Sequence, residues 1–362
     1  MKRSEFFINS GDGNPRNSEG SFVTLNDGRI LFVYSRYTGE SREDNADCDL
    51  ASIISADGGK SWSTPEIMFR HNPDEGNNLM SVSLLRLQSG RILLVYCAKK
   101  EIPGEEYPAF ITICRYSDDE AATWSEAKKL TSARYNIGGN NDRLIQLKNG
   151  RIIMPVFFIQ VSRTPKGQGF YPVLATTLYS DDNGENWYES GNYIFPPQNC
   201  RSGTQEPGIV ELNDGRLLMW MRTDLLCQYH CYSYDNGETW SPALPWKYFP
   251  CTVTPLSIKR DPADGKLIGI WSDGDPRWGV KIVPEDSWDR TPFAMSVSRD
   301  EGKTWGEKVL LEDDPRRGYC YTAMLFTDEA MLLAYCCGGH GHWPLQDMKI
   351  VRLPRNKESF TI

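Results

Sequence analysis

One stretch of the chain places a glutamate and an arginine where they could act together on a ligand. It reads Glu206-Pro-Gly-Ile-Val-Glu-Leu-Asn-Asp-Gly-Arg-Leu-Leu-Met-Trp-Met-Arg222. The Asp-Gly pair between two apolar runs predicts a β-hairpin, with Glu206 near its start and Arg222 at its end. On adjacent strands the two side chains would face a common space, where they could bind an anionic group or move a proton. The alternative is a surface ion pair with no chemical role.

A repeated eight-residue pattern, S-x-D-x-G-x-T-W, predicts the elements that position such residues. One copy is Ser298-Arg-Asp-Glu-Gly-Lys-Thr-Trp305, and the others begin at Ser55, Ser117, Ser180 and Ser233. Asp hydrogen-bonds the backbone just ahead of it and Gly accepts positive φ, so each copy predicts a tight turn between two strands. The Trp then returns to the core. The second copy has Ala121 where the pattern has Gly.

A second repeat of the same period predicts a second hairpin in each unit. Its copies are Leu25-Asn-Asp-Gly-Arg-Ile-Leu31, Leu87-Gln-Ser-Gly-Arg-Ile-Leu93, Leu147-Lys-Asn-Gly-Arg-Ile-Ile153, Leu212-Asn-Asp-Gly-Arg-Leu-Leu218 and a looser Asp264-Gly-Lys-Leu-Ile268. Two hairpins make a four-stranded sheet, and such sheets arranged radially form a propeller. The sequence therefore predicts an all-β, six-bladed β-propeller with almost no helix. We expect residues 1–362 to form a single domain, with Glu5-Phe-Phe-Ile8 adding a strand to the last blade.

The loops that lead into the innermost strands of a propeller gather on one face, and chemistry is expected there. In this chain these loops are polar where a plain turn would need only Gly. They are Pro15-Arg-Asn-Ser-Glu19, Asn77-Asn78, Asn140-Asn-Asp-Arg143, Thr204-Gln-Glu206 and Gly318-Tyr-Cys-Tyr321.

Composition limits the classes of partner. The net charge of −8 argues against a nucleic-acid binder, which needs a basic face, although a few converging arginines could still hold a small anion. No apolar run is long enough to cross a membrane, and Met1-Lys-Arg-Ser-Glu-Phe-Phe lacks the apolar segment of a signal peptide. We therefore expect neither a nucleic acid nor a membrane as partner.

The cysteines and histidines favour a reducing compartment and no metal. Ten Cys are scattered, several of them inside strand-like runs, which indicates buried free thiols and a cytoplasmic location. Secretion is the alternative if a leader has been removed. His340 and His342 could bind a metal, but two ligands without a matching cluster indicate a polar loop instead. No metal and no cofactor are predicted.

The five copies of the eight-residue pattern, which we call boxes, resemble the sialidase (neuraminidase) superfamily together with the propeller period and the polar loops. The resemblance is to its bacterial and trypanosomal exo-sialidases and extends over nearly the whole chain. The boxes occur in other propellers and are structural turns, so the resemblance in function depends on the site residues. It implies a retaining glycoside hydrolase whose single catalytic domain releases terminal sialic acid, or a related anionic sugar, from glycoconjugates. The implied partner is a sialylated or other acidic glycan.

Family sialidases hold the sugar carboxylate with three arginines, which here implies Arg16, Arg222 and Arg290. Arg16 stands where the family has an R-I-P motif, and is followed instead by Asn17-Ser18. The Glu206 to Arg222 stretch is similar to the family pattern around the second arginine. The third precedes the last box by a few residues, which selects Arg290 over Arg277.

The resemblance also implies three catalytic residues. Tyr321-Thr-Ala-Met324 resembles the family's Y-S-x-L, so Tyr321 is the implied nucleophile, with Tyr319 as the alternative. Glu206 is its implied partner. Asp44, eleven residues before the first box, is the implied acid/base, and Asp47 is the alternative.

The implied chemistry explains these residue types. A sialoside carries a carboxylate on its anomeric carbon, so a neutral Tyr whose proton moves toward Glu206 avoids the repulsion an anionic nucleophile would meet. Three planar guanidiniums match the carboxylate. Asp44, partly desolvated under substrate, is expected to hold a raised pKa and to protonate the leaving oxygen.

Two other function classes are open at this point. One is a hydrolase or lyase acting on a uronic acid or related sugar, because a carboxylate-binding propeller can be retuned by its rim loops. The other is a non-catalytic sugar-binding propeller, for which loss of the Tyr or the acid would be the sign.

Overall fold

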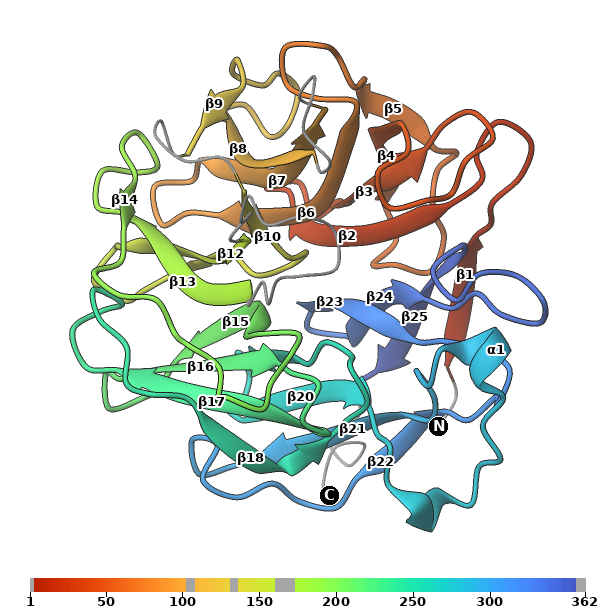
Figure 1. The fold of residues 1–362 in the computed structure, drawn as a ribbon. Helices are drawn as coiled ribbons and strands as arrows, with labels where there is room; N and C mark the ends of the chain where they lie inside the picture. The colour runs from red at the N-terminus through yellow and green to blue at the C-terminus, as the bar shows by residue number, and fades with distance from the viewer. Residues whose placement is uncertain (1–2, 102–107, 131–135, 160–172, 356–362) are drawn as a thin grey trace.

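The protein is an all-β molecule, described by a computed structural model for residues 3–101, 108–130, 136–159 and 173–355. Within these ranges, helix is limited to α1 (Pro284–Ser287) and the 3-10 turn Pro276–Trp278. The prediction of an all-β chain with almost no helix is confirmed. Figure 1 shows the sheets arranged around a central axis, with β2, β6, β15 and β23 close to it.

The strands pair almost entirely in antiparallel fashion. The largest sheet holds eight strands: β2 (Asn17–Thr24), β3 (Ile30–Tyr37), β4 (Cys48–Ser55), β5 (Glu66–Phe69), β6 (Asn78–Arg86), β7 (Ile92–Lys100), β8 (Ala109–Ser117) and β9 (Lys128–Lys129). A five-stranded sheet follows: β10 (Ile137–Gly139), β11 (Ile145–Gln146), β12 (Ile152–Ile159), β13 (Val173–Ser180) and β14 (Tyr188–Glu189).

Three four-stranded sheets complete the ring. They are β15 (Gln205–Glu211), β16 (Leu217–Arg222), β17 (Cys227–Ser233) and β18 (Leu244–Pro250); then β19 (Ser257–Arg260), β20 (Leu267–Ser272), β21 (Phe293–Ser298) and β22 (Val309–Glu312); then β1 (Ser4–Ile8), β23 (Cys320–Phe326), β24 (Ala330–Cys336) and β25 (Met348–Pro354). The antiparallel pairing of β1 with β25 confirms the prediction that Glu5-Phe-Phe-Ile8 joins the last sheet.

The prediction of a six-bladed β-propeller, with six separate sheets, is wrong. The described strands form four blade-sized sheets and one eight-stranded sheet that contains the first two repeats. A parallel bridge between Cys48 and Asn78 joins β4 to β6. The backbone N–H of Cys48 donates to the carbonyl of Asn77 (3.0 Å), and the side-chain amide of Asn78 donates to the carbonyl of Ala46 (2.6 Å). The chain thus enters β6 along the end of β4, where the free backbone groups of both strands pair.

The eight-residue boxes are tight turns built as their residue types predict. In the first box the hydroxyl of Ser55 donates to the Asp57 carboxylate (2.8 Å), which also accepts the backbone N–H of Lys60 and Ser61 (both 2.9 Å). Gly59 has φ 83°, in the left-handed region. Ala121, in the second box, has φ 66° and keeps the turn despite its Cβ.

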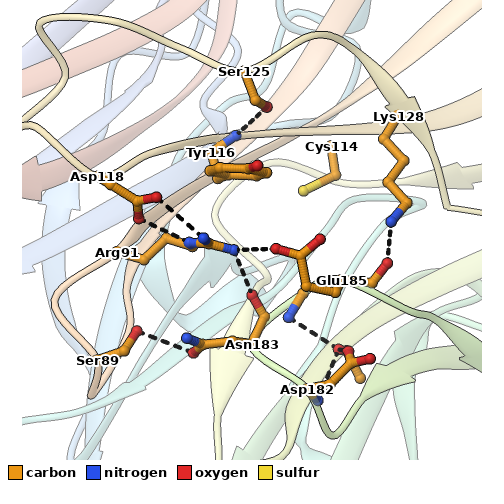
Figure 2. A network of polar contacts seen from close by, with 12 residues as sticks. Ser89, Arg91, Cys114, Tyr116, Asp118, Ser125, Lys128, Asp182, Asn183 and Glu185 are labelled. Carbon is orange, nitrogen blue, oxygen red and sulfur yellow. Dashed lines mark hydrogen bonds and ion pairs between the residues drawn. The ribbon is translucent and has the colours of Figure 1, made fainter.

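The arginine of the second repeat links each box to its neighbour. Arg91 ion-pairs with Asp118 in the box of its own repeat (2.8 Å) and with Glu185 in the next box (2.6 Å), as Figure 2 shows. Its guanidinium also lies 3.9 Å from the centre of the Tyr116 ring. Arg151 repeats this arrangement one unit later, with Asp181 and Glu238. The two repeats therefore form one set of contacts that ties neighbouring units together at the outside of the ring.

The core consists of clusters of apolar side chains between adjacent sheets. Each box tryptophan packs against one such cluster, and Trp240 is the most buried of the five, at 5% exposure. Between the fourth and fifth units the cluster is aromatic, with the Phe249 ring 4.7 Å from that of Trp305 and 4.8 Å from that of Trp271. Among the described residues, no helix has the length and apolar character that a membrane span requires.

Candidate active site

Glu206, Arg222 and Tyr321 meet at the inner edge of two sheets. Glu206 lies on β15 and Arg222 ends β16, where the register pairs Arg222 with Gln205. One oxygen of the Glu206 carboxylate accepts from Arg222 (2.8 Å) and also from the phenol of Tyr321 on β23 (2.9 Å). The hairpin predicted from the sequence thus places its Glu and Arg together, and a third strand brings Tyr321 to them.

The backbone of the inner strands turns these side chains inward. Glu206 (φ 47°) and Tyr321 (φ 60°) both have positive φ, and each sits where the register of its strand shifts. Glu19 on β2 and Ser81 on β6 occupy the same kind of bulge, with φ of 51° and 60°. A bulge re-aims a side chain, and positive φ is costly for a residue with a Cβ. The first, second, fourth and sixth repeats therefore all point one bulged residue at the central space.

These residues line a cavity of about 300 Å³. Its charged lining comprises Glu19, Asp44, Lys99, Glu206, Arg222 and Arg290, with the Tyr321 phenol among them. Aromatic and apolar side chains, including Phe110, Phe157 and Trp288, supply the rest of the wall. A concave site with a few converging polar groups on an apolar wall is the usual form of a small-molecule site.

The three predicted arginines approach the cavity from different parts of the chain: Arg16 precedes β2, Arg222 ends β16 and Arg290 lies in the loop before β21. Arg16 is fully buried behind it, ion-pairs with Asp44 (2.5 Å) and lies 4.5 Å from the centre of the Tyr37 ring. Arg290 is 7% exposed, and its guanidinium lies 5.5 Å from the centre of the Tyr321 ring. Nε of Arg16 and Nε of Arg222 are buried without a hydrogen-bond partner.

The second oxygen of Glu206 is also buried without a partner. Buried polar atoms are nearly always paired in proteins, so such groups beside a cavity indicate a place where a ligand or water completes the hydrogen bonding.

Asp44 lies in the loop between β3 and β4 with its side chain 66% exposed toward the cavity. Partial desolvation raises its pKa, but Arg16 and Lys99 lower it more, and the net pKa lies below the usual value. The Nζ of Lys99 donates to the backbone carbonyl of Asp44 (2.5 Å). In the free protein the pKa is thus shifted opposite to the raised value expected from the sequence, because two cations flank the carboxylate.

Tyr321 is protonated at neutral pH. Burial raises its pKa well above the usual value and the Glu206 carboxylate raises it further, while Arg290 and Arg222 act in the opposite direction. The phenol therefore donates its proton to Glu206 in the observed hydrogen bond.

The alternatives weighed from the sequence lie outside this cavity. Tyr319 is 1% exposed and stacks against Phe293 in the core. Asp47 accepts from the Asn77 amide (3.1 Å), and Arg277 ion-pairs with Asp275 (3.1 Å) with a side chain 56% exposed. None of the three candidates lines the cavity.

Several cavity residues were not identified from the sequence. Glu19, only 3% exposed, hydrogen-bonds to the hydroxyl of Ser81, and one of its oxygens lies 3.8 Å from Nη2 of Arg16. Lys99 is 4% exposed beside Asp44, and Asn140 is 2% exposed with an unpartnered amide nitrogen. Glu19 and Asn140 belong to the polar loops that the sequence marks, whereas Lys99 sits in a strand and gives no such signal.

In the described part of the chain, no cluster of three or more His, Cys, Asp or Glu side chains is arranged as a metal site. His340 instead pairs with Asp314 (2.7 Å). All ten cysteines are free, and nine of them are buried.

The chain is similar to several known proteins. The BNR repeat-like domain family matches residues 34–333. A sialidase of Paraclostridium sordellii is 31% identical over 349 residues, which cover 88% of this chain and 81% of that protein. An anhydrosialidase of Macrobdella decora is 29% identical over 237 residues, 60% of this chain, and the match spans only 28% of that longer relative.

Among solved structures, the intramolecular trans-sialidase from Ruminococcus gnavus in complex with oseltamivir carboxylate has a TM-score of 0.71. The match covers 96% of this chain and 97% of that chain at 16% sequence identity, which shows a shared fold.

Proposed function

This chain belongs to the sialidase superfamily of BNR-repeat proteins, and from that premise we propose that it is a retaining exo-α-sialidase. Its substrate would be a glycoconjugate that ends in sialic acid or a closely related carboxylated sugar. Tyr321 would be the nucleophile, Glu206 its base and Asp44 the acid/base. Arg16, Arg222 and Arg290, which we name the arginine triad, would bind the sugar carboxylate.

The observation that carries the proposal is the hydrogen-bonded series from Tyr321 to Glu206 to Arg222 at the wall of the cavity. A phenol with a raised pKa is a poor nucleophile unless a base takes its proton as it attacks. Glu206 already accepts that proton's hydrogen bond, and Arg222 stabilises the carboxylate. Attack by Tyr321 on the anomeric carbon would break the bond to the leaving oxygen and pass the phenol proton to Glu206.

The charge balance around the cavity supports a carboxylated substrate. The arginine triad and Lys99 supply four cations, against the three carboxylates of Glu19, Asp44 and Glu206. In the free protein Arg16 pairs through one nitrogen with Asp44, a residue of a surface loop. A substrate carboxylate would replace Asp44 there, because it offers the same two acceptor oxygens to the buried guanidinium.

That exchange would also prepare Asp44 for its role. The pKa of Asp44 is lowered in the free protein partly by its contact with Arg16. Once a substrate carboxylate neutralises Arg16 and covers the cavity, loss of this contact and further desolvation both raise the pKa of Asp44. A protonated Asp44 could then donate to the leaving oxygen.

The test is a turnover screen of the purified protein with aryl sialosides and aryl glucuronides, followed by identification of the released sugar. Release of free sialic acid by the wild type, and not by Tyr321→Phe, is the expected result. Release of an anhydro-sugar, lighter by one water, would instead match the name of the Macrobdella decora relative, an anhydrosialidase. Turnover of glucuronides alone would favour the uronic acid reading. Binding without turnover of either class would contradict an enzyme and favour a sugar-binding propeller.

We propose further that residues 1–362 act as one domain in a reducing, cytoplasmic compartment. Ten free cysteines support a reducing compartment, because the oxidising environment that secreted proteins meet favours disulfides in chains with many thiols. Detection of the protein in fractionated cells is the corresponding test, and recovery outside the cytoplasm would contradict it.

A further inference from the structure

Arg290 is a buried cation whose hydrogen-bond partner is a sulfur atom. Its Nη1 lies 2.9 Å from Sγ of Cys320, the residue before Tyr321. Arg290 is 7% exposed and Cys320 is 1% exposed. Among the described residues, no carboxylate lies within ion-pair distance of Arg290. Arg222, in contrast, has Glu206 at 2.8 Å, and Arg16 has Asp44 at 2.5 Å.

A second cysteine lies close to the same sulfur. Cys336 on β24 is opposite Cys320 in the register of β23 and β24. The Sγ of Cys336 is in turn 3.4 Å from the hydroxyl of Ser18, the second residue after Arg16. The Cys320 sulfur accepts a hydrogen bond from the Arg290 guanidinium. A neutral thiol is a weak acceptor, whereas a thiolate is a strong one.

We propose that Cys320 is a thiolate in the folded protein and is the counter-ion that positions Arg290 at the cavity. A buried charge needs a paired charge, and the sulfur is the atom in direct contact with this guanidinium. Cys320 does not touch the cavity, so it acts on a ligand only through Arg290. The consequence for substrate rests on the proposed function, because the positioned guanidinium would bind the sugar carboxylate.

The electrostatics of the surrounding elements agree with the geometry. Burial raises the pKa of Cys320, but the hydrogen bond from Cys336 and the charge of Arg290 lower it more, against an opposing effect of Glu206 on β15, so the net pKa is lowered. Burial and Cys320 raise the pKa of the Cys336 thiol well above its usual value, although the charge of Arg16 acts in the opposite direction. Tyr321 stays protonated and adds no charge.

The other nine cysteines all have raised pKa values, so one thiolate per chain is expected near neutral pH. The first measurement is the ultraviolet thiolate absorbance of the folded wild type between about pH 5 and about pH 8. We expect the signal of one thiolate, its loss in Cys320→Ser and in Arg290→Gln, and its retention in Cys114→Ser. Cys114 is a matched control, since it is buried on β8 and has a pKa raised to about 12.

No thiolate in the wild type over this range, or an unchanged signal in Cys320→Ser, would overturn the ionised pair. This readout needs no substrate, so it stands whether or not the protein is a sialidase. Because the wild-type titration and Arg290→Gln report on the same pair, the test survives poor folding of Cys320→Ser.

The second measurement addresses positioning. Cys320→Ser keeps a small polar group without the charge, and we expect it to raise KM for a sialoside about tenfold while kcat changes much less. The wild type should also lose affinity as pH falls through the pKa of Cys320, a dependence that the variant lacks. Cys114→Ser should match the wild type in both respects. A thiolate without any change in KM or in the pH profile of Cys320→Ser would overturn the positioning role.

Discussion

The outer turns and the inner bulges of this protein repeat in opposite ways. At the outer turns both backbone and side chains repeat: Ser55 and Asp57 of the first box make the same contacts as Ser298 and Asp300 of the last. At the inner bulges only the backbone repeats. Positive φ recurs there, but the residue is Glu19, Ser81, Glu206 or Tyr321 according to the unit. The repeated side chains build the ring, and the unrepeated ones supply its chemistry.

Asp142 shows how the same backbone conformation serves a structural end. It has φ 58° in the third unit, but its carboxylate is saturated by the hydroxyl of Ser21, the Nζ of Lys259 and the backbone N–H of Met324. It therefore ties its own unit to three others. Glu206 in the fourth unit instead keeps one oxygen without a partner beside the cavity. The number of satisfied atoms, rather than the position, distinguishes a structural carboxylate from a functional one.

The largest expected effect is on turnover when an inner bulge loses its reactive group. Tyr321→Phe removes one hydroxyl and leaves a ring of the same shape, so the fold should persist. We expect kcat for an aryl sialoside to fall at least about 1,000-fold, since the nucleophile is lost. A fluorinated sialosyl inhibitor should add its mass to the Tyr321 peptide of the wild type. An adduct on Tyr319, or full activity in Tyr321→Phe, would contradict the assignment.

The second prediction removes a repeated side chain at an outer turn. Trp240→Ala should lower the free energy of unfolding by about 3 to 4 kcal/mol, because a buried aromatic leaves a cavity. Its indole N–H also donates to the hydroxyl of Thr177 (3.3 Å). Denaturant unfolding measures the change, with Trp187→Ala, at a more exposed box tryptophan, as the milder control. Equal and small losses in both variants would mean that the boxes do not carry the core.

The third prediction keeps the charge of the arginine triad and changes its geometry. Arg222→Lys retains a cation but cannot hold Glu206 and a ligand carboxylate with one planar fork. We expect kcat/KM to fall roughly 30-fold, about 2 kcal/mol, with KM raised and kcat lowered together. Arg277→Lys, outside the cavity, is the matched control. A neutral amide analogue that binds as well as the carboxylate would contradict the triad and favour a neutral-sugar binder.

The local features of this fold were predictable because their causes are local. The boxes and Asp-Gly hairpins follow from hydrogen bonds within a few residues, and the hairpin from Glu206 to Arg222 follows from the same turn chemistry. The parallel bridge between Cys48 and Asn78 was not predictable, since it joins two repeats through tertiary packing. Nor was the pairing of Arg16 with Asp44, which depends on where a long loop lies in the free protein.

The positive φ of the bulges was equally hidden, because Glu206 and Tyr321 are residues that normally avoid that conformation. Only the surrounding sheets impose it. The same limit explains Cys320, whose role depends on Arg290, in the loop before β21, and on the neighbouring Cys336 at the end of β24. In the sequence it is one of ten scattered cysteines.

The smallest expected effect concerns the charge at a single outer turn. Hydrogen bonds from the Ser61 side chain and backbone lower the pKa of Asp57 to about 2, below its usual value. A carboxyl with a lowered pKa in the folded state stabilises the fold above its unfolded pKa of about 4, and this contribution is lost as pH falls through about 2. Asp57→Asn should therefore lower the free energy of unfolding at neutral pH by less than about 1 kcal/mol, because the turn is exposed and four other boxes remain. The corresponding fall in Tm should be small.

The gap in Tm between the wild type and Asp57→Asn is the quantity to follow, by thermal unfolding from neutral pH downward. It should be constant above about pH 4 and should close toward about pH 2, where the wild-type carboxyl is protonated as well. Asp328→Asn, in the exposed turn before β24 and outside the boxes, is the matched control. A gap in Tm that persists at low pH would mean that the box aspartate stabilises its turn through its shape and not through its charge. In that case the charge of a carboxylate would matter only at the inner bulges that line the cavity, and the outer turns would be stabilised without it.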